Sequence, residues 1–217
     1  DAQNFDPSYV GGVKKRLGFA KFTSAAKTTP TGTFVSGLYG ASLSNCTAFM
    51  LATEGTVLHD ITAGDWATTI SGATITVDTM VSMCMFNDLF IIANTGGGPY
   101  KWTGSGAAAA LGGTPPPNAK YVAVHRSRVW GAGPGYDHVA LASQASRINF
   151  SKLNDPENWT ATDDAGSINI NPNDGAIVNG ICSGKDFLVV SKSAPSSGGL
   201  EGNLYVIMGS SPFDFSV

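Results

Sequence analysis

Charged side chains are scarce in this chain. Asp, Glu, Lys and Arg make up 13% of its 217 residues, about half of the roughly 25% that is usual for soluble domains. Ser, Thr, Asn and Gly must therefore cover much of the surface. Two explanations stay open: a strand-and-turn protein with a polar, uncharged surface, or a protein whose faces are covered by neighbours in an assembly, since Lys and Glu are depleted at interfaces.

Basic patches and long apolar runs are also missing. The formal net charge is -3, and the one basic run is the short segment Lys14–Arg16. Binding of duplex DNA by neutralisation of its phosphates is therefore disfavoured. No apolar run approaches the roughly 20 residues that a membrane-spanning helix needs, so no membrane association is predicted.

Cysteine is rare and unpaired in its pattern. Cys46, Cys84 and Cys182 are an odd number and lie far apart, and two of them fall inside or beside apolar strand patterns. We expect all three to be small buried hydrophobic residues rather than disulfide partners or metal ligands.

The glycine-rich segments do not complete a nucleotide-binding or nucleophile motif. Gly131–Gly135 is followed by Tyr136 where a dinucleotide-binding loop has its third glycine. Gly96–Gly98 is not followed by Gly-Lys-Ser/Thr, and Gly40–Ser44 lacks the last glycine of a hydrolase elbow. These segments are interpreted as loops.

Metal and acid–base patterns are incomplete too. Asn169, Asn171 and Asn173 have the spacing of a calcium loop, but Asp174 occupies the position that needs glycine. Asp163–Asp164 is an adjacent pair, and adjacent residues of an extended segment point apart. The histidines form no His-x-x-x-His pair: His59, His125 and His138. We nominate no catalytic residue, no metal ligand and no cofactor-binding residue, and we predict that the protein is not an enzyme.

A series of short strands is what the sequence does contain, most clearly in residues 121–159. Tyr121–His125 and Arg128–Gly131 are apolar runs joined by the polar pair Arg126-Ser127, which is typical of two antiparallel strands meeting at a tight turn. Ile148 and Phe150 then alternate with polar neighbours, as in a half-buried strand. Residues 121–159 therefore predict a single antiparallel sheet.

This opening hairpin recurs at intervals near 40 residues. The copies are Ala48–Thr53 with Thr56–Asp60, Met80–Met85 with Leu89–Ala93, Tyr121–His125 with Arg128–Gly131, and Ile177–Cys182 with Phe187–Lys192. Repeats of this length are typical of β-propeller blades. We predict that Leu89–Ala93, Arg128–Gly131 and Phe187–Lys192 are the second strands of successive sheets.

The fold expected from these patterns is all-β, with β-propeller-like blades of short antiparallel strands. About four blade-like units are visible, and the set need not be complete. Residues 1–32 are expected to form an N-terminal arm and connector, and residues 33–217 the propeller-like domain. Ala107–Leu111 is expected to be a loop or a single turn, and helix should stay below about a tenth of the residues. Further strands are expected at Thr33–Gly40, around Ile75 and Val77, around Val139 and Leu141, around Ile168 and Ile170, and at Leu204–Met208.

The segment Ser151–Trp159 is somewhat like the Asp-box turn of sialidase-type propellers, with proline in place of the glycine. The Asp-box is a structural turn, so the likeness indicates a propeller and not an enzyme. We expect Asn and Asp side chains to close the turn on backbone amides, and Trp159 to pack between neighbouring sheets.

Several short motifs together resemble bacteriophage virion proteins of the tail hub or nozzle type, found in short-tailed phages. They are Asn4–Asp6, Lys15–Phe19, His125–Gly133, Asn149–Ser151 and Asp155–Trp159. In that family the opening motif typically reads Lys-Arg-Pro-Gly-aromatic, and this chain departs from it by a leucine in place of the proline.

The resemblance implies a structural role in the virion. It implies a β-propeller-bearing subunit of a homo-oligomeric ring in the phage tail, which contacts other tail proteins and the adaptor and portal proteins. The genome DNA would pass through the ring without specific binding, and neither a cofactor nor a membrane is implied. Proteins of this type are much longer than 217 residues, so the chain is expected to be a fragment or a reduced version.

Two other classes stay open. A glycan-binding or glycoside-hydrolase-like propeller would place carboxylates and one or more tryptophans in a central pocket; the candidates are Trp66, Trp102, Trp130 and Trp159. A β-sandwich interaction module would explain the same strands without a repeat.

Overall fold

The computed structural model describes residues 5–7, 13–15, 34–77, 79–94, 98–113, 115, 119–133, 145–161, 164–172, 174–193, 202–211 and 214–217. Within these ranges the protein consists of β-strands and loops and contains no α-helix. Consequently, none of the described segments is a helix with the length and apolar character that crossing a membrane requires.

Four antiparallel sheets follow one another along the chain, each built from strands that are neighbours in sequence. Sheet 1 contains β3 (Val35–Ser42), β4 (Ala48–Glu54), β5 (Val57–Asp60) and β6 (Thr68–Ile70). Sheet 2 contains β7 (Ser82–Phe86), β8 (Leu89–Ala93), β9 (Tyr100–Trp102) and β10 (Ala109–Ala110). Sheet 3 contains β11 (Tyr121–His125), β12 (Arg128–Ala132), β13 (Arg147–Phe150) and β14 (Gly166–Asn169). Sheet 4 contains β15 (Ile177–Ser183), β16 (Leu188–Ser193) and β17 (Gly202–Ile207).

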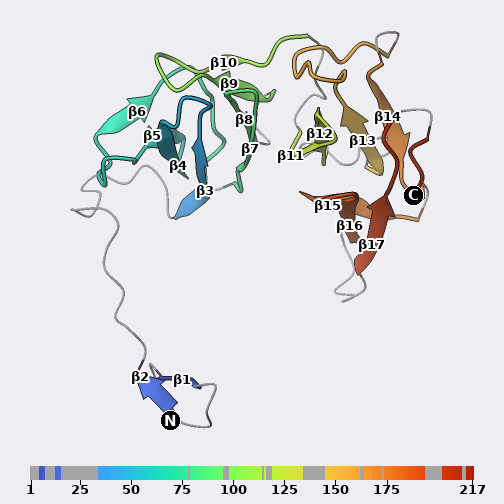
Figure 1. Ribbon diagram of the computed structural model, residues 1–217, viewed down its shortest axis with the longest axis horizontal. Coiled ribbons are helices and arrows are strands. Elements are labelled where there is room, and N and C mark those ends of the chain that lie inside the picture. Colours follow the sequence, from blue (N-terminus) through green and yellow to red (C-terminus); the bar gives the residue numbers. More distant parts are fainter. Residues whose placement is uncertain are drawn as a thin grey trace.

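The four sheets are arranged as the blades of a β-propeller (Figure 1). The first strand of each sheet is the innermost: β3 packs beside β7, β7 beside β11, and β11 beside β15. Among the described residues, β15 and β3 do not pack against each other in this way, and the ribbons of sheets 1 and 4 stand apart in Figure 1. Separate from these sheets, β1 (Phe5–Pro7) and β2 (Val13–Lys15) pair as a two-stranded ribbon.

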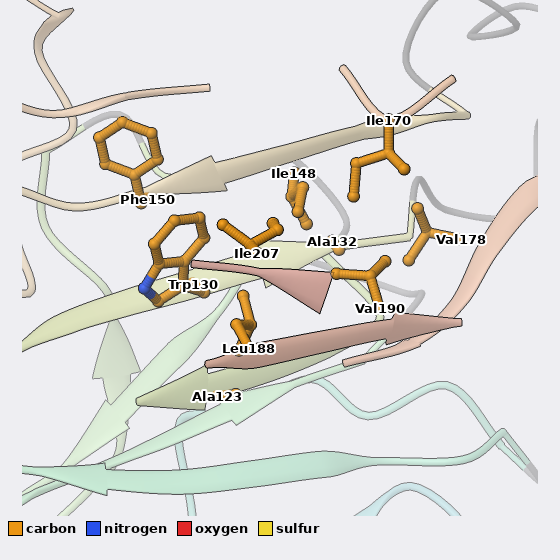
Figure 2. Close-up of a cluster of buried hydrophobic side chains, with 10 residues drawn as sticks. All are labelled: Ala123, Trp130, Ala132, Ile148, Phe150, Ile170, Val178, Leu188, Val190 and Ile207. Atoms are coloured by element: carbon orange, nitrogen blue, oxygen red, sulfur yellow. The ribbon is translucent and has the colours of Figure 1, made fainter. Parts of the chain in front are cut away.

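A hydrophobic core fills each space between successive sheets. Leu51 and Leu58 of sheet 1 pack with Phe90 and Trp102 of sheet 2 in the first core. The second core joins sheets 2 and 3, and its buried members are Cys84, Phe86, Ile91, Ala93, Leu111, Val122, Val129 and Trp159. In the third core, residues of sheet 3 face residues of sheet 4 (Figure 2): Ala123, Trp130, Ala132, Ile148, Phe150 and Ile170 against Val178, Leu188, Val190 and Ile207.

The central sheets are apolar on both faces, which explains their continuous apolar runs. In β8, Phe90 and Ile92 belong to the first core, whereas Ile91 and Ala93 belong to the second. Successive side chains of a strand point to opposite faces, so a strand between two cores needs an apolar residue at every position. β8 reads Leu-Phe-Ile-Ile-Ala for this reason.

Tight turns set the register of the innermost hairpins. Asn87 and Asp88 between β7 and β8 have φ angles of 48° and 62°, and Arg126 and Ser127 between β11 and β12 have 50° and 55°. Positive φ at both central residues is the signature of a type I′ turn, whose twist matches that of the flanking strands. The two-residue turn predicted at Arg126-Ser127 is therefore present.

The prediction of equivalent second strands is confirmed. β8, β12 and β16 are each the second strand of their sheet, and they match the predicted ranges to within a residue or two. The strands predicted at residues 33–40, 168–170 and 204–208 correspond to β3, β14 and β17. Four successive sheets, rather than two sheets packed face to face, also exclude the β-sandwich alternative for the described residues.

Three local predictions were wrong. The hairpin at residues 48–60 is the second and third strand of sheet 1, because β3, rich in Gly and Ser, occupies the first position. Ile75 is buried but lies in a loop, where the backbone N–H of Thr76 donates to the side chain of Asn94 rather than to a neighbouring strand. Ala109–Ala110 pairs with β9 as a short strand instead of forming only a loop.

Two predictions stay untested. Val139 and Leu141 lie outside the described residues. The division of the chain into residues 1–32 and 33–217 remains a prediction, although all four sheets fall in the second part.

Candidate functional site

Polar contacts tie neighbouring sheets together at the turns of their inner hairpins. Between sheets 1 and 2, the carboxylate of Asp88 accepts hydrogen bonds from the backbone N–H and the hydroxyl of Ser44, at 2.7 and 2.5 Å. These hydrogen bonds hold the pKa of Asp88 below its ordinary value. The carboxylate in the turn of sheet 2 thus accepts hydrogen bonds from two donors in the turn of sheet 1. These hydrogen bonds fix the orientation of the two sheets relative to each other.

Sheets 3 and 4 are joined in the same way. The guanidinium of Arg126 lies 3.2 Å from a carboxylate oxygen of Asp186, and Nδ1 of His125 lies 3.0 Å from the hydroxyl of Ser183. Burial is the largest cause that lowers the pKa of His125, and the positive charge of Arg126 is the second. His125 is therefore a neutral structural partner near pH 7 rather than a charged group.

The junction of sheets 2 and 3 carries an ion pair farther from the axis. The ammonium of Lys101 on β9 lies 2.5 Å from Oε1 of Glu157, and the same oxygen accepts the backbone N–H of Gly112 at 2.8 Å. The hydrogen bond from Lys101 lowers the pKa of Glu157. Next to it, Gly113 has φ of +71°, and an added Cβ would lie 2.0 Å from the carbonyl oxygen of Glu157. The backbones approach too closely there for any side chain.

Lys192 on β16 is a fully buried charge at the junction of sheets 3 and 4. Its ammonium donates to the hydroxyl of Ser146 at 2.8 Å and to the carbonyl oxygens of Ile170 and Asn171 at 2.8 and 3.1 Å. It also contacts both carboxylate oxygens of Asp174, at 2.8 and 2.9 Å. A buried ammonium is tolerated only when it is paired and hydrogen-bonded, and here the partners fix the end of sheet 3 against sheet 4.

Arg128 on β12 plays a comparable part inside sheet 3. Its guanidinium is buried, donates to the carbonyl oxygen of Ser151 at 2.9 Å, and pairs with the carboxylate of Asp164 at 2.5 Å. Neither Arg128 nor Lys192 was nominated from the sequence. The available signal was a single charged residue in each of the apolar-rich second strands β12 and β16, because charged side chains are almost never fully buried unless they are paired.

The Asp-box-like segment is a structural turn, as predicted. A carboxylate oxygen of Asp155 accepts the backbone N–H of Glu157 at 3.0 Å, and the carboxamide oxygen of Asn158 accepts the N–H of Thr160, also at 3.0 Å. The indole N–H of Trp159 donates to a backbone oxygen of the same turn at 2.9 Å, and its ring packs in the second core between sheets 2 and 3.

The tryptophans do not form a central pocket. Trp102, Trp130 and Trp159 are 4%, 0% and 9% exposed and belong to the cores between sheets. Trp66 packs edge-on against His59 of β5, with ring centroids 5.4 Å apart. Three of the four tryptophans are therefore core residues, and the fourth packs on a histidine. These positions give no support to the glycan-binding alternative.

The incomplete metal patterns are not assembled by the fold among the residues that the structure describes. No group of three or more His, Cys, Asp or Glu side chains there could hold a metal ion. His59 and His125 belong to different sheets, and the side chain of Asn171 donates to Asp174 and to the hydroxyl of Tyr205. His138, Asp163 and Asn173 lie outside the described residues.

The cysteine prediction was correct for one residue of three. Cys84 is buried in the second core, and burial raises the pKa of its thiol to about 12. Cys46 and Cys182 are exposed, contrary to the prediction. Cys46 lies in the β3–β4 turn, and Cys182 lies on the face of sheet 4 that no other sheet covers among the described residues, so neither has a core to enter.

Sheet 4 leaves one apolar face uncovered. Along β17, Leu204 is 73% and Val206 is 41% exposed, and Met208 just beyond the strand is 56% exposed. Alternate residues of a strand share a face, and Val206 pairs across to Val189, which pairs across to Cys182. We call these five residues the open face of sheet 4: Cys182, Val189, Leu204, Val206 and Met208.

Sheet 1 exposes a single apolar side chain, Leu38, on the face that points away from sheet 2. Leu38 is 66% exposed and is paired across to Ala52, which is paired across to His59. Ala52 and His59 are 0% and 2% exposed, so this face of sheet 1 is otherwise covered.

The open face of sheet 4 is the candidate functional site. It is a candidate interaction surface, because contiguous exposed apolar patches mark places where other macromolecules pack. No protein-family model and no curated protein sequence matches this chain.

Proposed function

We propose that this protein is a structural subunit of a phage tail hub or nozzle, in which it helps to join tail components around the channel through which DNA leaves the particle. The observation that carries the proposal is the exposed apolar face of sheet 4 in a propeller-like set of sheets. A contiguous exposed apolar face is typical of a surface on which another protein packs.

The way in which the sheets are joined is consistent with a mechanical role. Every junction between neighbouring sheets combines an apolar core with a polar contact, for example that of Asp88 with Ser44, Lys101 with Glu157 or Lys192 with Asp174. An apolar core combined with a hydrogen-bonded polar contact resists sliding of one sheet past the next better than an apolar core alone, because hydrogen bonds require a fixed geometry. A tail component needs such rigidity when DNA passes.

The assignment to a tail hub or nozzle in particular depends on the sequence motifs. Three of them fall in or next to strands of sheet 3. His125–Gly133 forms the turn and second strand of the inner hairpin, Asn149–Ser151 lies at the end of β13, and Asp155–Trp159 forms the Asp-box-like turn. The net charge of -3 and the low charge content suit a channel protein that lets DNA pass without binding its phosphates tightly. The proposal assigns no catalysis and no cofactor to the chain.

The location of the protein tests this function. Virions of the virus that encodes the chain would be purified and labelled with a gold-conjugated antibody raised against it. The proposal predicts gold at the tail and the protein among the virion components identified by mass spectrometry. Label on the capsid alone, or a protein found in infected cells but absent from purified virions, would refute the proposal.

A further inference from the structure

The outermost strand of sheet 4 is longer than those of the other sheets. The outer edges of sheets 1, 2 and 3 are formed by β6, β10 and β14, which contain three, two and four residues. The outer edge of sheet 4 is formed by β17, which contains six. Short edge strands are one way in which proteins keep the edge of a sheet from pairing with another chain. Sheet 4 lacks this protection.

The other common protections are absent from β17 as well. Its sequence Gly-Asn-Leu-Tyr-Val-Ile contains no charged residue and no proline. Its pairing with β16 runs in unbroken register from Gly202 to Ile207, without a bulge. Charged side chains, prolines and bulges are the features that discourage pairing at an edge. A regular, uncharged edge of this length presents a row of backbone donors and acceptors to an incoming strand.

One bridge identifies the backbone groups that point outward from this edge. The N–H of Met208 donates to the carbonyl oxygen of Ser216, and the N–H of Ser216 donates to the carbonyl oxygen of Met208, both at 3.0 Å. These groups of Met208 point away from β16, which pairs with the opposite edge of β17. Successive residues of an antiparallel strand direct their groups to alternate edges. Leu204 and Val206 therefore also direct theirs outward, where no strand pairs with them among the described residues.

The same two residues carry exposed apolar side chains. Leu204 is 73% and Val206 is 41% exposed, and both belong to the open face of sheet 4. A strand that paired with this edge would place every second side chain beside them on that face. The backbone groups thus require an extended chain, and the open face favours apolar side chains at alternate positions of that chain. A helix could cover the apolar side chains but could not pair with the row of backbone groups.

We propose that the outer edge of β17 binds an extended segment of a neighbouring tail protein, which joins sheet 4 as a further strand. The segment pairs with the backbone of Leu204 and Val206 and lays apolar side chains along the open face of sheet 4. The inference rests on the proposed function, and it names the surface that holds the neighbour and the kind of segment that the neighbour supplies.

Hydrogen exchange in intact virions tests the pairing directly. Purified virions and the isolated chain would be incubated in deuterium oxide, and mass spectrometry with fragmentation would resolve single amides. In the isolated chain, the amides of Leu204 and Val206 should exchange quickly. Those of Tyr205 and Ile207, which point toward β16, should be protected. In virions, exchange at Leu204 and Val206 should slow by at least about tenfold, because a paired amide exchanges only when its strand opens.

Two substitutions at one position test the pairing independently. Val206→Pro removes the outward N–H and keeps an apolar side chain, and proline is tolerated on an edge strand whose N–H faces solvent. Val206→Ile is the matched control, because it changes the same side chain and keeps the N–H. Far-UV circular dichroism checks that both variants are folded. Virions should incorporate Val206→Ile at the wild-type level and Val206→Pro at least about tenfold less, the effect of losing one hydrogen bond from a buried pairing.

The outcomes separate this inference from the proposed function. Equal exchange at Leu204 and Val206 in virions and in the isolated chain would overturn the inference, because a neighbour that packs on side chains alone leaves these amides open. Wild-type incorporation of a folded Val206→Pro would overturn it too. If Val206→Pro does not fold, the exchange at the wild-type amides decides. A protein absent from virions would refute the proposed function and this inference together, whereas a protein present there with unchanged exchange would refute this inference alone.

Discussion

Replacing Lys192 by methionine should lower the free energy of unfolding by about 3–5 kcal/mol, the range for breaking a buried ion pair by removing one partner. Methionine keeps most of the apolar stem but supplies no donor. The carboxylate of Asp174 and the carbonyl oxygens of Ile170 and Asn171 would lose the ammonium that lies 2.8–3.1 Å from them. Each buried acceptor left without a partner costs about 1–3 kcal/mol.

The remaining contacts of Asp174 place the expected loss at the lower end of that range. Its carboxylate is 17% exposed and still accepts the backbone N–H of Ala176 at 2.9 Å. Burial raises the pKa of Asp174, but the hydrogen bonds from Lys192 and Ala176 outweigh burial and leave the pKa below its ordinary value. Without Lys192 the pKa should rise, because burial then acts against fewer hydrogen bonds.

Urea denaturation followed by tryptophan fluorescence measures the change, with Lys185→Met as the control. Lys185 is exposed in the β15–β16 turn, and its substitution should change stability by no more than about 0.5 kcal/mol. A double-mutant cycle with Asp174→Asn should give a coupling energy of at least about 1 kcal/mol. A Lys192→Met variant within about 1 kcal/mol of the wild type would refute the claim that this charge holds sheets 3 and 4 together.

Three further results are expected. Glu157→Gln should lower the free energy of unfolding by at most about 1 kcal/mol at pH 7, because Lys101 and Glu157 are both partly exposed. The pKa of Glu157 is lower in the folded protein than its ordinary value of 4.5, so the stability difference from wild type should be complete above pH 4.5 and vanish as the pH falls through the folded pKa. Denaturation curves from pH 3 to 7 measure this difference. Gly113→Ala should destabilise by about 1–3 kcal/mol, because its Cβ would collide with a backbone oxygen, and a melting temperature equal to wild type would contradict this. Under native conditions a thiol reagent should modify Cys46 quickly and Cys84 only after unfolding; rapid loss of both thiols would show that the second core is not closed.

Much of the fold could be predicted because the central strands are apolar at consecutive positions. β8 and β12 lie between two cores, so their sequences stand out, and the polar pairs Asn87-Asp88 and Arg126-Ser127 separate them cleanly from the preceding strands. β3 was harder to place as the first strand of sheet 1. Its Leu38 is exposed, and its Gly and Ser residues weaken the apolar signal.

The candidate site was not predictable to the same degree. Cys182 and Cys84 occupy equivalent positions of their hairpins, and local sequence cannot tell which of them a neighbouring sheet covers. Covering depends on how many sheets the propeller contains, which is a property of the whole chain. The ion pair of Lys192 with Asp174 likewise joins strand β16 to a loop before β15, and only the fold brings them together.

The reactivity of Cys182 in the assembled particle tests the account most directly. Cys182 lies on the open face of sheet 4 and is exposed in the isolated chain, whereas Cys84 is buried. A thiol reagent followed by mass spectrometry of the labelled peptides should modify Cys182 in the isolated protein and leave it unmodified in intact virions, because a neighbouring tail protein then covers the open face. Equal modification of Cys182 in the isolated protein and in virions would contradict the account.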